Sequence, residues 1–181
     1  MRGFVMSDMI IAGLITGIVS SLFASIFFVF LMYRMKPKLR LSAKIAKTVF
    51  EGQTVYAFKV INAGKRDAIS LVAELLLIQP VVVEGGIGYN VIEIPLARNK
   101  LFHIRPLSKV GDKFGAVFEF ITTENIEEEW TKYNNSYLLF RLTAQDALSM
   151  FYHVFSCEFD SPETGIVTGR FAKGAKMDIY E

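Results

Sequence analysis

The feature that most constrains this chain is one long apolar run near its beginning. Residues 9–33 contain no charged side chain and no proline. At about 1.5 Å per residue, a helix of this length measures roughly 37 Å, which exceeds the ~30 Å hydrocarbon core of a bilayer. A cleaved signal peptide usually has a shorter apolar core followed by small residues, whereas bulky and then basic residues follow here. The run therefore predicts a retained transmembrane helix.

Positive charge is concentrated on one side of the predicted span. Arg2 and the amino terminus precede it, whereas the cations that follow it are Arg34, Lys36, Lys38 and Arg40. Short flanks rich in Lys and Arg stay in the cytoplasm. We therefore expect residues 1–8 to lie outside the cell membrane, residues 34–40 to form a basic junction, and residues 41–181 to form a cytoplasmic domain. The four cations can also bind anionic lipid head groups; the alternative is that they only fix the orientation.

Small residues recur every four positions along two neighbouring ridges of the predicted span. These residues are Ala12, Gly13, Thr16, Gly17, Ser20, Ser21, Ala24 and Ser25. Residues four apart share a helix face, so the two ridges form one flat strip. Helices associate in lipid where small residues let their backbones approach closely. The strip predicts helix–helix packing and a homo-oligomer, with simple tolerance of small residues in a span as the alternative.

The rest of the chain, about 140 residues, suits one domain with one core. Its apolar residues mostly alternate with polar ones or form short continuous runs. Strands are predicted at residues 39–47, 54–63, 68–78, 90–96, 101–105, 115–122, 137–143, 150–160, 166–171 and 176–180. Turn residues lie between them, notably at 62–67, 84–88 and 111–113. Short strands separated by turns predict an antiparallel β-sandwich, with a closed barrel as the alternative.

One segment of this domain has a helical signature instead. Asn125 is followed three residues later by Glu128, which resembles a capping box, and acidic residues gather in the first turn. A short surface helix over residues 125–133, with Trp130 on its inner face, is expected. Its acidic residues 124–129 are interpreted as a solvated face, with a binding surface as the alternative.

Several short motifs occur in the order found in a known family. They are Arg34-x-Lys36-Pro37-Lys38-Leu39-Arg40-Leu41-Ser42, Phe58-Lys-Val-x-Asn62, the basic turn Lys65-Arg66, Ile69-x-Leu-Val-Ala-Glu-Leu, Phe140-Arg-Leu-Thr-Ala-Gln-Asp146-Ala-Leu-Ser149 and Ile166-Val-Thr-Gly169-Arg170-Phe171. Over residues 20–172 the chain resembles the second transmembrane helix and cytoplasmic immunoglobulin-like domain of inward-rectifier potassium channels. The resemblance implies an immunoglobulin-like sandwich, assembly into a ring of four, and head-group contact by Arg34, Lys36 and Lys38.

The chain departs from that family where ion selectivity is concerned. Those channels have two spans per chain, a pore helix and a Thr-Val-Gly-Tyr-Gly filter, whereas this chain has one predicted span and no such filter. Gly88-Tyr89 lies deep in the soluble domain, and no pore helix precedes it. Potassium selectivity by carbonyl rings is therefore not expected.

Residue patterns for catalysis, metals and cofactors give no site. The glycines at 85, 86 and 88 lack the Lys-Ser/Thr of a phosphate loop. His153 and Cys157 share one face of a predicted strand with Phe155, but two ligands do not make a zinc site. Ser149 is interpreted as part of a turn, and the single Cys157, which fits a reducing compartment, as an inert core thiol. We expect neither an enzyme nor a metal or cofactor, and a net charge of +2 gives no argument for binding a nucleic-acid duplex.

Two functions remain open from the sequence. The first is a channel-like or membrane-perturbing effector, of the kind used in bacterial antiviral defence, in which a cytoplasmic sensing domain controls the clustered spans. The second is a passive membrane-tethered adaptor that recruits a partner to the inner leaflet. The turn Lys65–Arg66 is the candidate surface for a cytoplasmic ligand or protein partner in either case.

Overall fold

The computed structural model describes residues 2–34, 36–110 and 115–181. The chain divides into two compact units, Met1–Lys36 and Pro37–Glu181. The first unit is a single helix, α1 (Arg2–Arg34). Its segment Met9–Arg34 is long and apolar enough to cross a membrane, judged by length and composition. The side chains of this segment are almost all exposed, and an apolar surface on every side suits lipid better than water.

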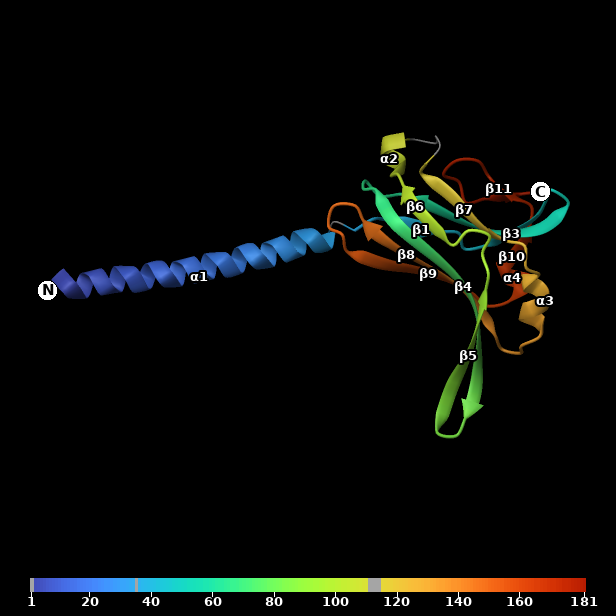
Figure 1. The fold of residues 1–181 in the computed structure, drawn as a ribbon, viewed down its shortest axis with the longest axis horizontal. Coiled ribbons are helices and arrows are strands. Elements are labelled where there is room, and N and C mark those ends of the chain that lie inside the picture. Colours follow the sequence, from blue (N-terminus) through green and yellow to red (C-terminus); the bar gives the residue numbers. More distant parts are fainter. Residues whose placement is uncertain (1, 35, 111–114) are drawn as a thin grey trace. The chain divides into compact units, whose positions relative to one another are not determined.

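The second unit is mainly β, as predicted, and contains two sheets that pack against each other as a β-sandwich (Figure 1). The first sheet consists of β1 (Leu39–Leu41), β2 (Ile45–Phe50), β3 (Gln53–Asn62), β7 (Val117–Thr122) and β10 (Ile166–Thr168). The second consists of β4 (Ala68–Val83), β5 (Gly86–Ile94), β6 (Lys100–Ile104), β8 (Tyr137–Asp146) and β9 (Tyr152–Phe159). In the first sheet β3 is central, and in the second sheet β4 and β8 are central.

The core lies between the two sheets and follows from the alternation of side chains along each strand. Along β8 the residues alternate without exception between half-buried and buried, because successive side chains point to opposite faces of a sheet. Phe140 of β8 stacks on Phe58 of the facing β3, with ring centroids 4.9 Å apart. The ring centroids of Phe120, in β7, and Phe140 are 5.8 Å apart. Aromatic residues from both sheets therefore hold the sandwich together.

Three short helices complete the described part of this unit: α2 (Leu107–Val110), α3 (Ile126–Thr131) and α4 (Pro162–Gly165). The predicted helix near residue 125 is confirmed as α3. The Asn125 side chain accepts a hydrogen bond from the Glu128 backbone N–H at 3.3 Å and donates one to the Glu128 carboxylate at 3.2 Å. Trp130 is buried, as expected, and its indole N–H donates to the Ser136 carbonyl at 3.1 Å.

A C-terminal segment covers the outer face of the first sheet. Its strands β11 (Arg170–Phe171) and β12 (Ile179–Tyr180) pair with each other, and Phe171 packs on Ala57 of β3. Beneath this segment Lys59 is fully buried; its ammonium donates to the Ala172 carbonyl and lies 5.5 Å over the Phe171 ring. The chain therefore uses its own C-terminal residues to cover this face.

Gly169 allows the C-terminal segment to lie so close. Its φ is +135°, and a Cβ at this position would lie 2.3 Å from the Tyr180 carbonyl oxygen. Glycine avoids both the strained backbone and the clash because it has no Cβ. Its loss would separate β11 from β12.

Several predicted strand boundaries are wrong. The strand predicted over 39–47 is two strands, because the chain bends at residues 43–44; just before the bend the Ser42 hydroxyl accepts the Lys59 backbone N–H at 3.1 Å. The strand predicted over 166–171 is broken at Gly169 into β10 and β11. The sandwich is also not entirely antiparallel, since β10 pairs with β2 in parallel. The turn predicted at 111–113 lies outside the described residues.

The largest correction concerns the segment 79–91. The sequence predicted that the strand would end at Ile78 and that residues 84–88 would form a turn. Instead, β4 continues to Val83 and the chain turns at residues 84–85. The following strand, β5, pairs with β4 along the whole length of β5. Beyond Ile78, β4 no longer pairs with β8. The two strands therefore project from the sandwich as a two-stranded arm, residues 79–90 (Figure 1).

Candidate functional site

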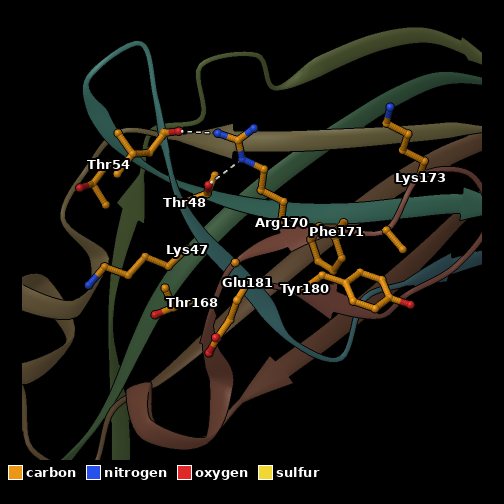
Figure 2. Close-up of a pocket in the computed structure, with 12 residues that line it drawn as sticks. Lys47, Thr48, Thr54, Thr168, Arg170, Phe171, Lys173, Tyr180 and Glu181 are labelled. Atoms are coloured by element: carbon orange, nitrogen blue, oxygen red, sulfur yellow. Dashed lines mark hydrogen bonds between the residues drawn. The ribbon is translucent and has the colours of Figure 1, made fainter.

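A groove of about 890 Å³ lies beside the C-terminal segment (Figure 2). Strand β2 contributes Lys47 and Thr48, and the C-terminal segment contributes Arg170, Phe171 and Tyr180. The groove thus combines aromatic and cationic side chains, and Glu181 adds a carboxylate to its lining (Figure 2). A smaller cavity of about 320 Å³ lies on the other side of Arg170 and Phe171, over Ala57 and Glu119.

Two cations of the groove are held in place by partners. The Arg170 guanidinium donates to the Thr48 hydroxyl and to the Val49 carbonyl, each at 3.1 Å. Lys47 forms a close ion pair with Glu127 of α3. Arg170 has no carboxylate partner among the ion pairs of the described residues. A ligand with an apolar body and an acidic group fits this combination of an aromatic floor and a positioned guanidinium.

Tyr56 of β3 lies next to the groove and links the first sheet to α3. Its hydroxyl is 3.2 Å from Asn125 Oδ1 and 3.2 Å from Glu127 Oε2. Burial, and then the negative charge of Glu127, raise the pKa of Tyr56 to about 12. The phenol is therefore neutral at physiological pH and acts as a hydrogen-bond donor that ties α3 to the first sheet.

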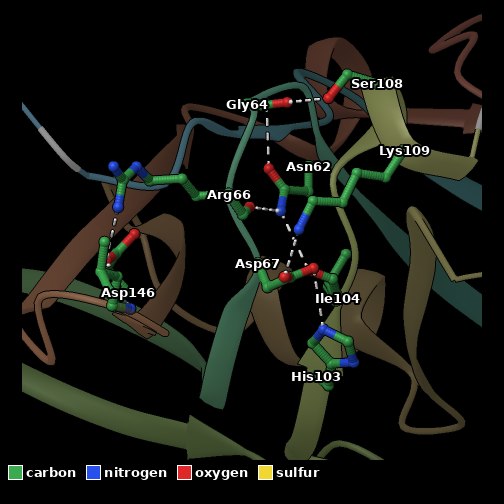
Figure 3. Close-up of polar contacts among 10 residues, drawn as sticks. Asn62, Gly64, Arg66, Asp67, His103, Ile104, Ser108, Lys109 and Asp146 are labelled. Carbon is green, nitrogen blue, oxygen red and sulfur yellow. Dashed lines mark hydrogen bonds and ion pairs between the residues drawn. The ribbon is translucent and has the colours of Figure 1, made fainter.

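The predicted basic turn Lys65–Arg66 joins β3 to β4 within a polar network (Figure 3). Asn62 organises the turn: its amide donates to the carbonyls of Arg66 and Ile104, at 2.7 and 3.1 Å, and its Oδ1 accepts from Gly64 N–H at 3.1 Å. Lys65 is exposed. The Arg66 guanidinium is 3.8 Å from the buried Asp146 carboxylate.

Asp67 follows the basic turn and is surrounded by cationic groups. Lys109 of α2 donates to Asp67 at 2.8 Å, and the His103 imidazole lies 3.3 Å away. The hydrogen bond from Lys109, with a smaller contribution from His103, lowers the pKa of Asp67. Part of the positive charge near the turn is therefore neutralised, whereas Lys65 stays exposed.

The four predicted head-group cations fall in both units. In the first unit the Arg34 guanidinium lies 5.4 Å over the Phe30 ring, and the Lys36 ammonium lies 5.0 Å over the Tyr33 ring. In the second unit Lys38 and Arg40 are exposed. The Lys38 carbonyl accepts the Ala63 backbone N–H at 2.9 Å, so the structure brings Lys38 beside the basic turn.

The small-residue strip is open on the surface of α1. A Cβ added at Gly13 or Gly17 would meet no atom within 4 Å. The hydroxyls of Thr16 and Ser25 donate to the carbonyls four residues earlier, at 2.8 and 2.9 Å. These two hydroxyls are satisfied within the helix, so Thr16 and Ser25 can be buried against another helix without leaving an unpaired polar group.

Sequence reasoning missed an apolar surface on the outer side of the second sheet. By the strand register, its members point away from the core: Leu76, Ile78, Pro80 and Val82 of β4, Ile87, Tyr89 and Val91 of β5, and Tyr137 and Leu139 of β8. We call this surface the arm face. Towards the tip of the arm Val82 is 92% exposed and Tyr89 is 63% exposed, whereas Leu76 and Ile78, next to β8, are already buried. Beyond Leu76 the same outer face becomes polar, with Arg141 and Glu74 paired at 2.6 Å.

The residues considered for catalysis and metal binding lie on β9 and in the turn before it. No group of three or more His, Cys, Asp and Glu residues that could hold a metal occurs among the described residues. Ser149 lies in the turn between β8 and β9, as predicted. Cys157, interpreted from the sequence as an inert core thiol, lies on β9, is partly buried and packs against the core. Burial, with a further contribution from Glu158, raises the pKa of Cys157.

Comparison with known proteins gives little beyond a partial likeness of fold. No family model matches this chain, and no curated protein sequence matches it. One of the similar solved structures is the sporulation control protein Spo0M from Bacillus subtilis, with 15% sequence identity and a TM-score of 0.40, over 68% of this chain and 48% of that chain. This chain thus spans about half the length of that protein. At this TM-score the likeness carries no argument about activity.

Proposed function

We propose that this chain is a single-pass cell-membrane protein that self-associates and acts as a membrane-perturbing effector under the control of its β-sandwich. In this proposal residues 9–33 span the membrane and residues 34–40 bind head groups at the inner surface, in keeping with the excess of Lys and Arg after the span. The β-sandwich lies in the cytoplasm. No catalytic step is part of this function.

The arm face is the observation that carries the proposal. Soluble monomers rarely leave a contiguous apolar patch of this kind uncovered, and such a patch marks a contact surface. Within the described residues β5 pairs only with β4, so its other edge is free to pair. We assign this surface to a second copy of the chain, because the anchor holds copies in one orientation and raises their effective concentration.

The small-residue strip of α1 supplies a second contact between copies. Gly13 and Gly17 leave room for a neighbouring helix, and the satisfied hydroxyls of Thr16 and Ser25 favour tight packing over a water-filled lining. A ring of four is the assembly that the resemblance to inward-rectifier channels implies. The span packing and the arm packing together would couple the cytoplasmic domain to the membrane.

The groove beside Arg170 is the sensing site in this scheme. A ligand there would contact Phe171, and Phe171 belongs to the segment that covers Lys59 and the outer face of β3. A ligand shifts an equilibrium only when it binds two states with different affinity. The groove meets this condition if the C-terminal segment adopts a different position in the active assembly.

The experiment is dye release from vesicles that contain the full-length protein. We expect leakage that rises steeply with the number of copies per vesicle, because the active species is an oligomer. The double substitution Gly13→Ile and Gly17→Ile should abolish leakage, whereas Ile18→Leu, on a bulky position of the same helix, should not change it. Leakage that is absent at every protein density, with and without acidic amphiphiles as trial ligands, contradicts an effector.

A membrane-tethered adaptor is the second candidate, and the satisfied hydroxyls of α1 favour it, since they leave the span without an evident polar lining. An adaptor would use the arm face for a different protein. Electrically silent bilayers, together with a stoichiometric complex that Val82→Lys disrupts, would support the adaptor over the effector.

A further inference from the structure

The turn between β8 and β9, residues 147–151, exposes large apolar side chains. Leu148 is 66% exposed, Met150 is 56% exposed and Phe151 is 52% exposed. A hairpin turn in water usually carries polar residues together with Gly, Asn or Asp. The backbone geometry of this turn therefore does not explain its apolar side chains.

The tip is held in one shape by Asp146, which is fully buried. Its carboxylate Oδ1 accepts the backbone N–H groups of Leu148 and Ser149, at 3.0 and 2.7 Å. Its own backbone carbonyl accepts the Met150 N–H at 2.9 Å, and its N–H donates to the Phe151 carbonyl at 3.1 Å. The apolar side chains are therefore presented by a preorganised turn, so little conformational entropy is lost when they bind a surface.

Cations lie around this apolar tip. A shallow cavity of about 470 Å³ is lined by Lys65, Arg66, Lys109 and its partner Asp67, together with Ala147 and Leu148, so the cations outnumber the one carboxylate. The two turns are joined directly, since the Ala147 N–H donates to the Asp67 carbonyl at 3.2 Å. The combination of exposed apolar side chains and a basic rim is the chemistry of an interfacial contact with an anionic bilayer.

The same end of the sandwich is tied to the end of the predicted span by a short stretch of chain. An extended chain from Arg34 to Lys38 covers at most roughly 14 Å. Lys38 in turn is bonded to the basic turn through Ala63, with N to O at 2.9 Å. The proposed span would therefore hold the sandwich near a bilayer through a short piece of chain, and that bilayer is an apolar surface available to the tip.

The geometry points to a second membrane contact: the 147–151 turn inserts Leu148, Met150 and Phe151 into the inner leaflet while Lys38, Lys65 and Arg66 bind anionic head groups. This contact rests on the proposed span and inside orientation, but it does not depend on oligomerisation or leakage. It would fix the orientation of the β-sandwich relative to the membrane surface. Insertion to roughly 5–10 Å, the depth of interfacial apolar faces, is expected.

The test uses full-length protein in phosphatidylcholine vesicles with and without phosphatidylserine, at a high ratio of lipid to protein. Cys157→Ala removes the native thiol, and Leu148→Cys receives an environment-sensitive fluorophore. We expect blue-shifted emission and quenching by spin-labelled lipids, both stronger with phosphatidylserine. The matched control is a label at Lys173→Cys, an exposed position in the loop between β11 and β12, which should emit as in water.

The cation requirement is tested by Lys65→Ala, which should shift the balance between inserted and water-exposed label about fivefold towards water. Water-like emission from the Leu148 label, while the protein stays in the vesicles, would overturn the inference and leave the proposed function standing. Protection that follows protein density and ignores lipid charge would also overturn it, because it would indicate contact with another copy. A monomeric protein with a buried label would support the inference and contradict the proposed self-association.

Discussion

On the outer face of the first sheet, the chain's own C-terminal segment lies over Ala57 and buries even the charged Lys59. On the outer face of the second sheet, the arm leaves Val82 and Ile87 in solvent, at 92% and 67% exposure (Figure 1). Both faces carry apolar side chains, but the chain covers only the first of them. The difference indicates that a monomer of this chain completes one side of its sandwich and leaves the other for a different molecule.

The treatment of charge differs between the two faces as well. Lys59 lies 3.8 Å from Glu119 under the C-terminal segment, whereas the arm face is apolar from Ile78 to Val82 and has a charged neighbour only at Glu93, opposite Leu76. A buried lysine is tolerated when its ammonium has partners, and here the Ala172 carbonyl supplies one. The covered face therefore depends on one specific arrangement of the C-terminal segment, while the arm face is suited to less specific apolar contact.

The largest expected effect is the contrast between Phe171→Ala and Val82→Ala. Phe171→Ala should lower the free energy of unfolding by about 3 kcal/mol, because it opens a cavity under the C-terminal segment. Val82→Ala should change it by less than about 0.5 kcal/mol, as for an ordinary exposed position. Urea unfolding of the full-length protein in detergent, followed by the fluorescence of the single Trp130, measures both. Equal effects would remove the distinction between the faces.

A substitution at the N-cap of α3 should have an intermediate effect on the free energy of unfolding. Asn125→Ala removes the side-chain acceptor for the Glu128 N–H and should cost about 1 kcal/mol. Asn125→Asp keeps an acceptor at the cap and serves as the control, with a change near zero. The same Trp130 signal applies. A cost as large as that of Phe171→Ala would mean that α3, rather than the C-terminal segment, holds this side together.

The smallest expected effect is a pH dependence of the covered face. Burial lowers the pKa of Lys59 below its ordinary 10.5. A lysine whose pKa is depressed in the folded state contributes most to the free energy of unfolding above pH 10.5. This contribution is lost as the pH falls from 10.5 to the folded-state pKa. Unfolding free energy should therefore rise towards pH 10.5 in the native chain relative to Lys59→Met, which keeps the aliphatic stem. Parallel pH profiles would contradict a desolvated ammonium.

The sequence predicted the features that depend on local chemistry. The apolar helix, the mainly β domain, the cap at Asn125 and the buried Trp130 all follow from composition, period and neighbouring residues. The turn at Ser149 was predicted correctly for the same reason. These features need no knowledge of which strands meet.

The features that were missed depend on long-range pairing. The glycines at 85, 86 and 88 predicted a turn, and the strand was predicted to end at Ile78. In the structure β4 continues through Pro80, which is tolerated because beyond Ile78 β4 pairs with β5 alone. The parallel pairing of β10 with β2 joins residues far apart in the chain. The groove beside Arg170 arises from that pairing, so only the stretch Gly169–Phe171, singled out by the channel resemblance, gave a hint of it.

The measurement that tests the account most directly is the oligomeric state of the full-length protein extracted in mild detergent, determined by native mass spectrometry. The account predicts an oligomer that the double substitution Val82→Lys and Ile87→Lys weakens at least about tenfold, since burying each apolar side chain contributes roughly 1.5–3 kcal/mol. At a protein concentration low enough for both forms to be monomeric, the Trp130 unfolding curve should be unchanged in that variant, because the loss of association no longer contributes to stability there. A monomeric native protein, or an oligomer that both lysines leave intact, would contradict the assignment of the arm face to a second copy.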